Sequence, residues 1–282
     1  MEIHTRNGAV FVREIEPICL RRVFDNGQAF RFSPCKDGYA GVAFGRYIEI
    51  TSYQNGLKLF PCTREEFSAY WRDYLDLDTC YAALFEAPDN ILQKGMEYGT
   101  GLRMLHQEPF ETLISFIVSA NNNIARIRGI VERLCARYGK SIAENLYAFP
   151  TPQALAGANC EQLRALGMGY RAPYVINTAQ KICNGFDLCA LREAGYAEAK
   201  RSLMTLPGVG PKVADCVLLF SLGYTQAFPA DVWMKRALAK AYGFCGNDAQ
   251  LTAFVQEKFG RYAGIAQQYL FYWIKNERGE IG

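Results

Sequence analysis

The residues best suited to chemistry lie between positions 206 and 231. A turn, Gly208-Val-Gly210, is followed by Pro211, by Lys212 and by an apolar segment, and Asp231 comes nineteen residues after the lysine. The two glycines permit positive φ and close approach of another molecule, and Pro211 suits the first position of a helix. Free backbone amides at such a helix end bind anions. The sequence therefore predicts a phosphate site with an amine beside it, although a Gly-x-Gly can also be a plain turn between helices.

Lys212 is the candidate nucleophile. The segment that follows it, 213–220, is apolar on nearly every face, which predicts a buried helix. A partly buried lysine at a helix N-terminus is disfavoured as a cation, so its amine becomes available to attack carbon. The alternative is a lysine that extends into solvent or pairs with a DNA phosphate.

Asp231 is the candidate partner carboxylate. Aspartate is also a preferred N-cap, and one oxygen can cap the helix that follows while the other faces a cleft. Asp215, three residues after Lys212, is a competing carboxylate. Cys216, four residues after the lysine, should share its face of the helix, unless it is only a core thiol.

Composition limits the classes of function. The chain has 282 residues, of which half are hydrophobic and 21% charged, as in ordinary globular proteins. Its formal net charge is only +3, so any surface that binds nucleic acid must be a local patch.

The cysteines point to a reducing compartment. Ten of them are scattered singly between Cys19 and Cys245, and the first twenty residues carry charges and lack the apolar core of a signal peptide. Neither the cysteines nor the two histidines follow a metal-binding spacing. No apolar run is long enough to span a bilayer. We expect a cytoplasmic monomer, nucleoid-associated if the source is prokaryotic, that needs no metal or organic cofactor.

The elements that must position these residues fall into two groups. Segments 41–53 and 56–60 are rich in β-branched and aromatic residues and predict hairpin strands, and a capping box, Thr63 to Glu66, opens a helix through Trp71 and Tyr74. From about Pro88 onward the pattern is helical, with apolar periodicity over 110–117 and 127–139.

The predicted fold is therefore α+β. We expect a small antiparallel β-rich domain over residues 1–85 and a larger α-helical domain over 86–282. A helix-hairpin-helix should lie at about 196–222.

Several motifs resemble a known family. Leu206–Cys216 together with Pro229–Val232 resembles the helix-hairpin-helix, Gly/Pro…Asp superfamily of DNA glycosylases. Ser119–Arg126, Gly167–Arg171 and Asp25–Arg31 resemble the 8-oxoguanine DNA glycosylase/lyase family. The likeness covers essentially the whole chain. It implies a bifunctional DNA glycosylase and β-lyase that excises 8-oxoguanine from duplex DNA, preferably opposite cytosine.

The resemblance implies roles for the residues that face the lesion. Lys212 would attack C1′ of the damaged nucleotide and form a Schiff base, and Asp231 would stabilise the cationic transition state. Cys216 and Phe271 would sandwich the flipped base. Gln267 would bind its Watson–Crick edge, with Gln268 as the alternative for that position.

Gly27 would read the modification itself. By resemblance, its carbonyl accepts a hydrogen bond from N7–H, a proton that 8-oxoguanine has and guanine lacks. Asn26-Gly27 is equally typical of a hairpin turn.

The remaining implied contacts concern the DNA backbone and the opposite strand. Asn121 would fill the vacated space, Arg126 and Arg171 would read the cytosine, and Tyr170 would wedge beside it. Without the resemblance Arg126 is a solvated helix charge. Gly208 and Gly210 would contact the DNA backbone.

The sequence departs from the family at two positions. Trp233 stands where eukaryotic members have a histidine, and Pro211 where other members often have a polar residue. Two alternatives remain open: an endonuclease III-like pyrimidine glycosylase, whose usual C-terminal four-cysteine loop is absent here, and a DNA-binding module without catalysis.

Overall fold

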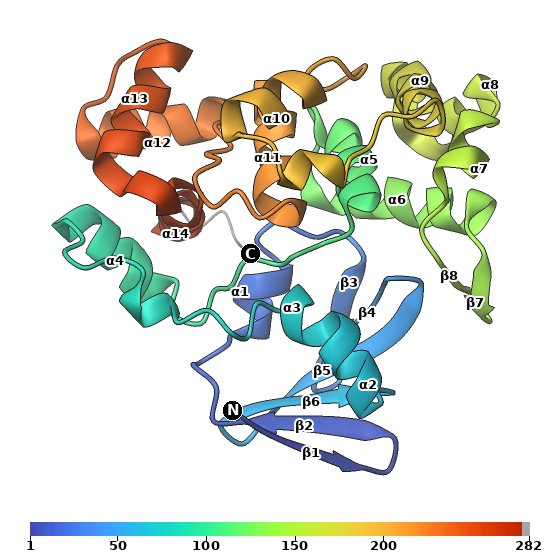
Figure 1. Cartoon of the computed structure of the whole chain (residues 1–282), viewed down its shortest axis with the longest axis horizontal. Coiled ribbons are helices and arrows are strands. Elements are labelled where there is room, and N and C mark those ends of the chain that lie inside the picture. The colour runs from blue at the N-terminus through green and yellow to red at the C-terminus, as the bar shows by residue number, and fades with distance from the viewer. Residues whose placement is uncertain (278–282) are drawn as a thin grey trace.

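The N-terminal part is a six-stranded antiparallel sheet. The computed structural model describes the backbone of residues 1–277 and the side chains of residues 1–274. The strand order is β1-β2-β6-β5-β4-β3 (Figure 1). The strands are β1 (Glu2–Arg6), β2 (Ala9–Arg13), β3 (Phe32–Cys35), β4 (Gly38–Ala43), β5 (Arg46–Tyr53) and β6 (Gly56–Phe60).

Alternating side chains give this sheet one buried face. Val10, Leu59 and Ile50 face one another across β2, β6 and β5, and all three are fully buried. The period of two puts the intervening residues on the opposite face, so one residue of slippage would expose this core. The predicted strands at 41–53 and 56–60 are confirmed, with a turn at Phe44-Gly45 that divides the first segment between β4 and β5.

Helices form most of the rest of the chain. They are α1 (Leu20–Phe24), α2 (Arg64–Glu66), α3 (Arg72–Tyr74), α4 (Asn90–Tyr98), α5 (Pro109–Ser119), α6 (Ile124–Tyr138), α7 (Pro152–Ala156), α8 (Cys160–Leu163), α9 (Ala172–Cys183), α10 (Tyr196–Leu203), α11 (Pro211–Ser221), α12 (Val232–Tyr242), α13 (Asp248–Phe259) and α14 (Ala263–Glu277). A short hairpin, β7 (Ser141–Ala143) and β8 (Leu146–Tyr147), interrupts them, and the prediction of an all-helical second part did not include it.

The predicted helix signals hold where the apolar period is clear. The capping box of Thr63 and Glu66 is present at α2, and a π-helical segment, Phe67–Trp71, carries the helix on into α3. The periodic segments 110–117 and 127–139 coincide with α5 and α6.

Two hydrophobic cores meet where the parts join. The sheet packs with α1 and the α2–α3 helix, and the helices have a larger core of their own. Phe30 and Tyr81 belong to the helical core, whereas Leu105 belongs to the sheet core. The chain therefore crosses between the cores on both sides of the predicted boundary at residue 85.

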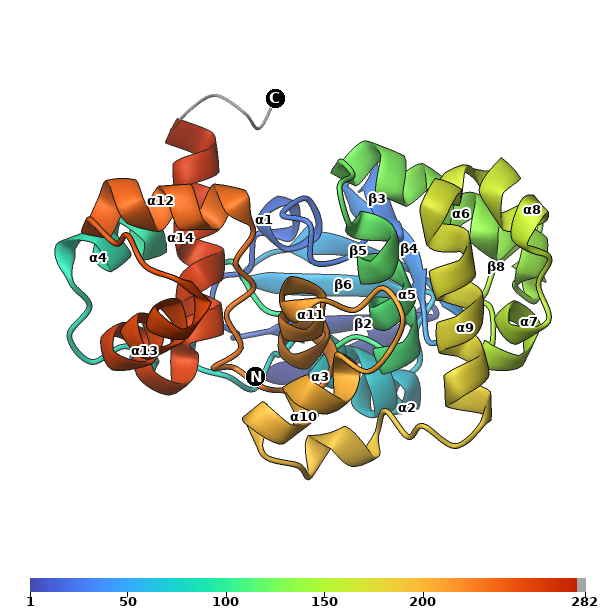
Figure 2. The ribbon, with the colours of Figure 1, turned by 90° about the horizontal axis from the view of Figure 1, so that it is seen from above.

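The helical part places α11 at the centre. Helices α12–α14 with α4 lie on one side and α6–α9 on the other, with α11 and α5 between them (Figure 2). Helix α11 packs against α5 and α10, and α14 packs against α4. Helices α10 and α11 with the loop between them occupy the stretch predicted as a helix-hairpin-helix.

Candidate active site

The two glycines before Lys212 have different physical roles. Gly208 has φ +80°, and a Cβ there would meet Tyr174 at 2.9 Å, so only glycine fits. Gly210 is the N-cap of α11 with an ordinary φ of −91°, and a Cβ there would meet no atom within 4 Å. The space in front of the α11 N-terminus is therefore open, as an anion site requires.

Lys212 lies on the first turn of α11 and points back toward α5. Its Nζ donates a hydrogen bond of 3.4 Å to Ser119 Oγ and lies 4.9 Å from the centre of the Phe116 ring. Ser119 Oγ in turn donates to the carbonyl of Phe116. The end of α5 thus holds the half-buried amine in place, through two residues to which the sequence analysis gave no role.

Cys216 lies one turn further along and is buried. Burial raises the pKa of this thiol to about 11, the Lys212 ammonium lowers it, and the Asp215 and Asp231 carboxylates raise it. The thiol is therefore neutral at physiological pH and is no nucleophile. Cys216 and Lys212 lie one turn apart on α11, so the thiol is close to the amine.

Asp231 is the N-cap of α12, as the preference of aspartate for this position predicted. Its Oδ1 accepts a hydrogen bond of 2.8 Å from the backbone N–H of Met234. The residue is exposed, and within the described part of the chain Oδ2 accepts no hydrogen bond. One oxygen is structural and the other is available.

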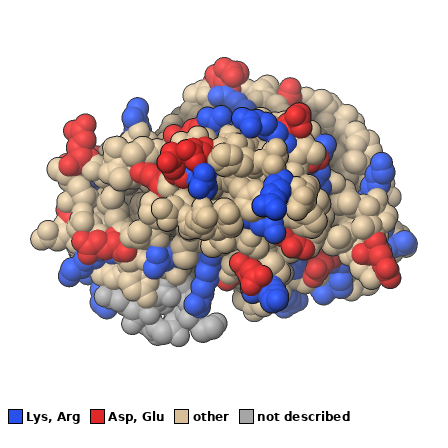
Figure 3. Space-filling model, turned by 90° about the horizontal axis from the view of Figure 1, so that it is seen from below, with Lys and Arg blue, Asp and Glu red and all other residues tan. Residues whose placement is uncertain are grey.

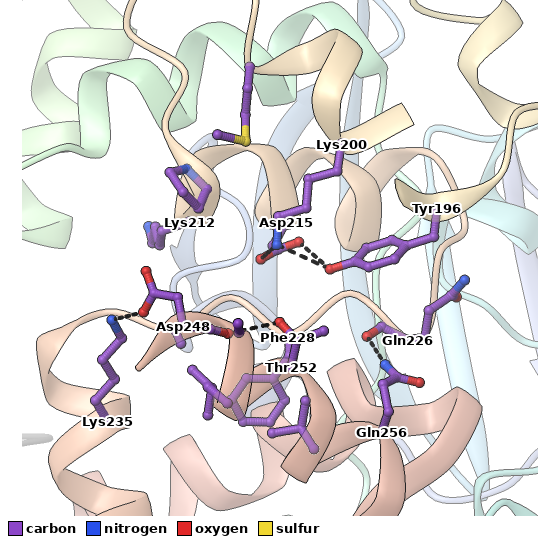
Figure 4. Close-up of a pocket in the computed structure, with 16 residues that line it drawn as sticks. Tyr196, Lys200, Lys212, Asp215, Gln226, Phe228, Lys235, Asp248, Thr252 and Gln256 are labelled. Carbon is purple, nitrogen blue, oxygen red and sulfur yellow. Dashed lines mark hydrogen bonds and ion pairs between the residues drawn. The ribbon is translucent and has the colours of Figure 1, made fainter. Parts of the chain in front are cut away.

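Asp215, the competing carboxylate, is occupied elsewhere. It forms an ion pair of 2.7 Å with Lys200 and accepts a hydrogen bond of 2.8 Å from the Tyr196 hydroxyl (Figure 4). Burial raises its pKa, and Lys200 opposes that rise. These contacts fasten α10 to α11 beside a cavity of about 320 Å³ that Lys212 also lines. Asp215 is thus a structural residue of the hairpin.

The predicted base-binding residues come from α11, α14 and the loop 25–31, and the loop contacts α14 through the hydrogen bond between Asn26 and Gln268. Gln267 and Gln268 are both buried, Phe271 is half-buried, and Cys216 comes from α11. Gly27 has φ +89°, and a Cβ there would lie 3.1 Å from the Ile124 side chain, so the loop requires glycine at this point.

A buried glutamine anchors this loop. The Nε2 of Gln28 donates to the carbonyls of Val23 and Arg103 at 2.9 and 2.8 Å, and its Oε1 accepts from the N–H of Leu105 at 2.9 Å. A fully satisfied buried amide gives the loop a single conformation. Gly27 is therefore held rigidly beside α6.

Three of the four residues predicted to face the opposite strand lie together. Asn121 has φ +49°, and its Nδ2 donates to the Tyr170 hydroxyl at 3.4 Å. Tyr170 is 53% exposed, and the Arg171 guanidinium lies 4.4 Å from its ring centre. Arg126 is exposed on the first turn of α6, where its backbone N–H donates to the Asn123 cap.

Arg171 donates hydrogen bonds to three backbone carbonyls of the protein. It is 5% exposed, and its guanidinium donates to the carbonyls of Ala120, Asn121 and Met168. These bonds hold the Asn121 loop in its left-handed conformation. Contact between Arg171 and a base would therefore require some of them to be exchanged.

Comparison with known proteins identifies the family. Residues 10–113 match the family model for the N-terminal domain of 8-oxoguanine DNA glycosylase, and residues 114–260 match that of the HhH-GPD superfamily of base excision DNA repair proteins. The chain belongs to the 8-oxoguanine DNA glycosylase/lyase family. This confirms the resemblance drawn from the sequence motifs and the predicted α+β fold with its helix-hairpin-helix glycosylase part.

Similar proteins cover between three quarters and nearly all of the glycosylase. It is 36% identical to the N-glycosylase/DNA lyase of Saccharomyces cerevisiae, over 90% of this chain and 82% of the relative. It is 32% identical to a probable N-glycosylase/DNA lyase of Methanothermobacter thermautotrophicus, over 74% and 73%. The 8-oxoguanine glycosylase/lyase of Clostridium acetobutylicum, solved with double-stranded DNA containing cytosine opposite 8-oxoguanine, superposes with a TM-score of 0.94 at 34% identity, over 99% of both chains.

Neither sign of charge dominates the sheet side of the molecule. On the face seen from the sheet side, acidic and basic side chains are interspersed (Figure 3). Among the described residues, no group of three or more His, Cys, Asp or Glu could hold a metal ion, and no helix is long and apolar enough to cross a membrane.

Proposed function

We propose that this DNA glycosylase/lyase excises 8-oxoguanine opposite cytosine through an imine formed by Lys212. The observation that carries the proposal is the position of Lys212. It stands on the first turn of α11, one turn from the neutral Cys216 thiol, with open space in front of the helix N-terminus.

The chemistry follows from these positions. The Lys212 amine attacks C1′, and the bond between C1′ and N9 breaks with its electron pair leaving on the base, which then takes up a proton. The sugar ring opens to an imine with Lys212, loss of a C2′ proton follows, and the 3′ phosphate is expelled by β-elimination. Asp231 Oδ2, free of the cap, stabilises the positive charge that develops on the sugar.

Recognition of the base uses three surfaces. Cys216 and Phe271 stack on its two faces, Gln267 pairs with its Watson–Crick edge, and the Gly27 carbonyl accepts N7–H. Guanine would oppose its N7 lone pair to that carbonyl and leave two buried acceptors unpaired, at a cost of about 1–3 kcal/mol. The rigid loop around Gly27 supports this role, because a mobile carbonyl could retreat from guanine.

The opposite strand meets Asn121, Tyr170, Arg171 and Arg126. Guanidinium groups match the acceptors on a cytosine edge, and the exposed Tyr170 ring can wedge between bases. Reading cytosine requires Arg171 to exchange bonds with the 120–121 backbone, so recognition of the partner base and ordering of the Asn121 loop would be linked. Gly208 and Gly210 present the α11 amides to a phosphate.

The two alternatives are weaker. An endonuclease III-like enzyme would share Lys212 and Asp231, but the match over residues 10–113 is to the N-terminal domain of 8-oxoguanine glycosylases. A DNA-binding module without catalysis would not require Lys212, Cys216 and Asp231, because binding of a phosphate needs only the backbone amides at the α11 N-terminus.

Borohydride trapping on a duplex with one 8-oxoguanine tests the proposal. We expect an adduct with the wild-type protein that is absent with Lys212→Gln and with undamaged DNA, and faster excision opposite cytosine than opposite the other three bases. Release of 8-oxoguanine without any adduct would reassign Lys212 to phosphate binding. Equal rates opposite all four bases would refute the cytosine preference alone.

A further inference from the structure

Three buried side-chain amides form a continuous chain between the Gly27 loop and α14. Asn26 Nδ2 donates to Gln268 Oε1 at 3.3 Å, and Gln268 Nε2 donates to Gln267 Oε1 at 2.6 Å. Asn26, Gln268 and Gln267 are only 4%, 5% and 4% exposed. We call Asn26, Gln268 and Gln267 the amide relay.

The polarity of the amide relay is fixed at one end by the backbone. Asn26 Oδ1 accepts a hydrogen bond of 3.1 Å from the N–H of Gln28, which closes a turn around Gly27. A backbone N–H can only donate, so Asn26 must turn its Nδ2 toward Gln268. Gln268 then presents its oxygen to Asn26 and its nitrogen to Gln267.

The orientation of the Gln267 amide is set by Gln268. Gln267 Oε1 accepts from Gln268, which leaves one lone pair on Oε1 and the N–H donors of Nε2 for a ligand. The Watson–Crick edge of 8-oxoguanine offers O6 as an acceptor beside N1–H as a donor. An amide with fixed polarity can pair with both atoms, whereas a flipped amide would oppose donor to donor and acceptor to acceptor.

We propose that Asn26 and Gln268 are positioning residues that couple the two readers of the lesion, the Gly27 carbonyl and the Gln267 amide. The turn that aims the carbonyl at N7–H also sets, through the amide relay, the orientation of the amide at the opposite edge of the base. Gln268 touches no substrate in this arrangement and acts through Gln267. The proposal rests on the roles proposed above for Gly27 and Gln267.

The test compares binding of a duplex containing 8-oxoguanine opposite cytosine with binding of the undamaged duplex. All proteins carry Lys212→Gln so that no excision occurs. Gln268→Met removes both relay bonds at similar volume, and Gln268→Glu keeps the acceptor for Asn26 while removing the donor to Gln267. Gln256→Met is the matched control, because Gln256 is a half-buried glutamine on α13 that donates to the carbonyl of Gln226, outside the relay.

We expect both Gln268 variants to lose lesion affinity by about five- to thirty-fold. Affinity for undamaged DNA should be unchanged, and Gln256→Met should leave both affinities unchanged. Combining Asn26→Ala with Gln268→Met should cost no more than the larger single effect, because both variants break the same relay.

A pH comparison separates positioning from mere packing. A carboxyl introduced by Gln268→Glu would be buried, and burial raises its pKa. When protonated it can again donate to Gln267, so its defect should shrink as the pH falls from about 8 to about 6. The defect of Gln268→Met should not change with pH.

Three outcomes would overturn the proposal. If the Gln268 variants keep the lesion preference of the parent, the relay has no role while the proposed function stands. If they lose affinity for both duplexes equally, Gln268 is merely structural. If the Lys212→Gln protein without a relay substitution has no preference for 8-oxoguanine, the proposed function fails, and the proposal for the amide relay fails too.

Discussion

At the scale of single residues, Cys216, Asp215 and Asp231 differ in protonation and in the contacts that they make. Cys216 provides a neutral surface, because burial keeps its thiol protonated. Asp215 is spent on Lys200 and Tyr196, which leaves Asp231 as the carboxylate with a free oxygen. Asp231 caps α12 through one oxygen, and the other oxygen is the one proposed to stabilise charge on the sugar.

The two roles of Asp231 can be separated by substitution. Asparagine caps helices as well as aspartate, so Asp231→Asn should change the free energy of unfolding by less than about 0.5 kcal/mol. It should slow excision about a hundredfold or more, because the negative charge is lost. Asp231→Ala should lose the charge and, in addition, about 1 kcal/mol of stability. Thermal unfolding and single-turnover excision measure the two effects, and an active Asn variant would exclude the electrostatic role.

Residue types indicated the candidate catalytic residues but not the side chains that hold them in place. Lys212 and Asp231 are predictable because a Gly-x-Gly turn and a helix start are local signals. The bond between Asn26 and Gln268 joins residues 242 positions apart, and each residue alone is an ordinary turn or helix residue. Ser119 likewise carries no local sign that it will meet Lys212.

At the scale of elements, the hairpin of α10 and α11 depends on its two glycines in different ways. Gly208 is demanded by backbone conformation and by contact with Tyr174, whereas Gly210 leaves space in front of the helix. The sequence pattern treats them alike, because φ and neighbours far along the chain are set by the tertiary fold.

Substitution should distinguish the two glycines. Gly208→Ala should lower the free energy of unfolding by about 1–3 kcal/mol, because alanine is strained at φ +80° and crowds Tyr174. Gly210→Ala should cost less than about 1 kcal/mol, since its backbone is ordinary, yet weaken DNA binding because the methyl group stands where a phosphate would approach. Unfolding curves and duplex titrations of both variants provide the comparison. Unimpaired DNA binding by Gly210→Ala would place the phosphate elsewhere.

The helices and strands that could be predicted are those with long and regular patterns of apolar residues. Helices α5 and α6 carry a clear apolar period and were predicted, as were the strands with alternating burial. The β7–β8 hairpin was missed because its five residues are largely exposed and offer no period.

At the scale of the whole molecule, buried polar contacts fasten the sheet part to the helical part. Arg31, which precedes β3, donates to the carbonyl of Tyr147 in β8, and its guanidinium lies 3.6 Å from the carboxylate of Glu111 on α5. Both side chains are mostly buried, and Glu111 Oε2 has no hydrogen-bond partner among the described residues. Burial raises the pKa of Glu111 to about 7, against the opposing effect of Arg31.

This carboxyl should make the stability of the enzyme depend on pH. Below its ordinary value of 4.5 the group is protonated in both the folded and the unfolded chain. Between 4.5 and about 7 the unfolded chain releases the proton while the folded chain keeps it, so stability falls as pH rises. Above that window both states are ionised and the loss of stability is complete, at about 3 kcal/mol.

Glu111→Gln should remove this pH-dependent component of stability, because a neutral amide does not titrate. Urea unfolding of the wild type and of Glu111→Gln across this pH range gives the free energy of unfolding against pH for each. Contributions from other titratable groups cancel in the difference between the two slopes. Parallel curves would show that Glu111 is already ionised in the folded enzyme and that Arg31 compensates its burial in full.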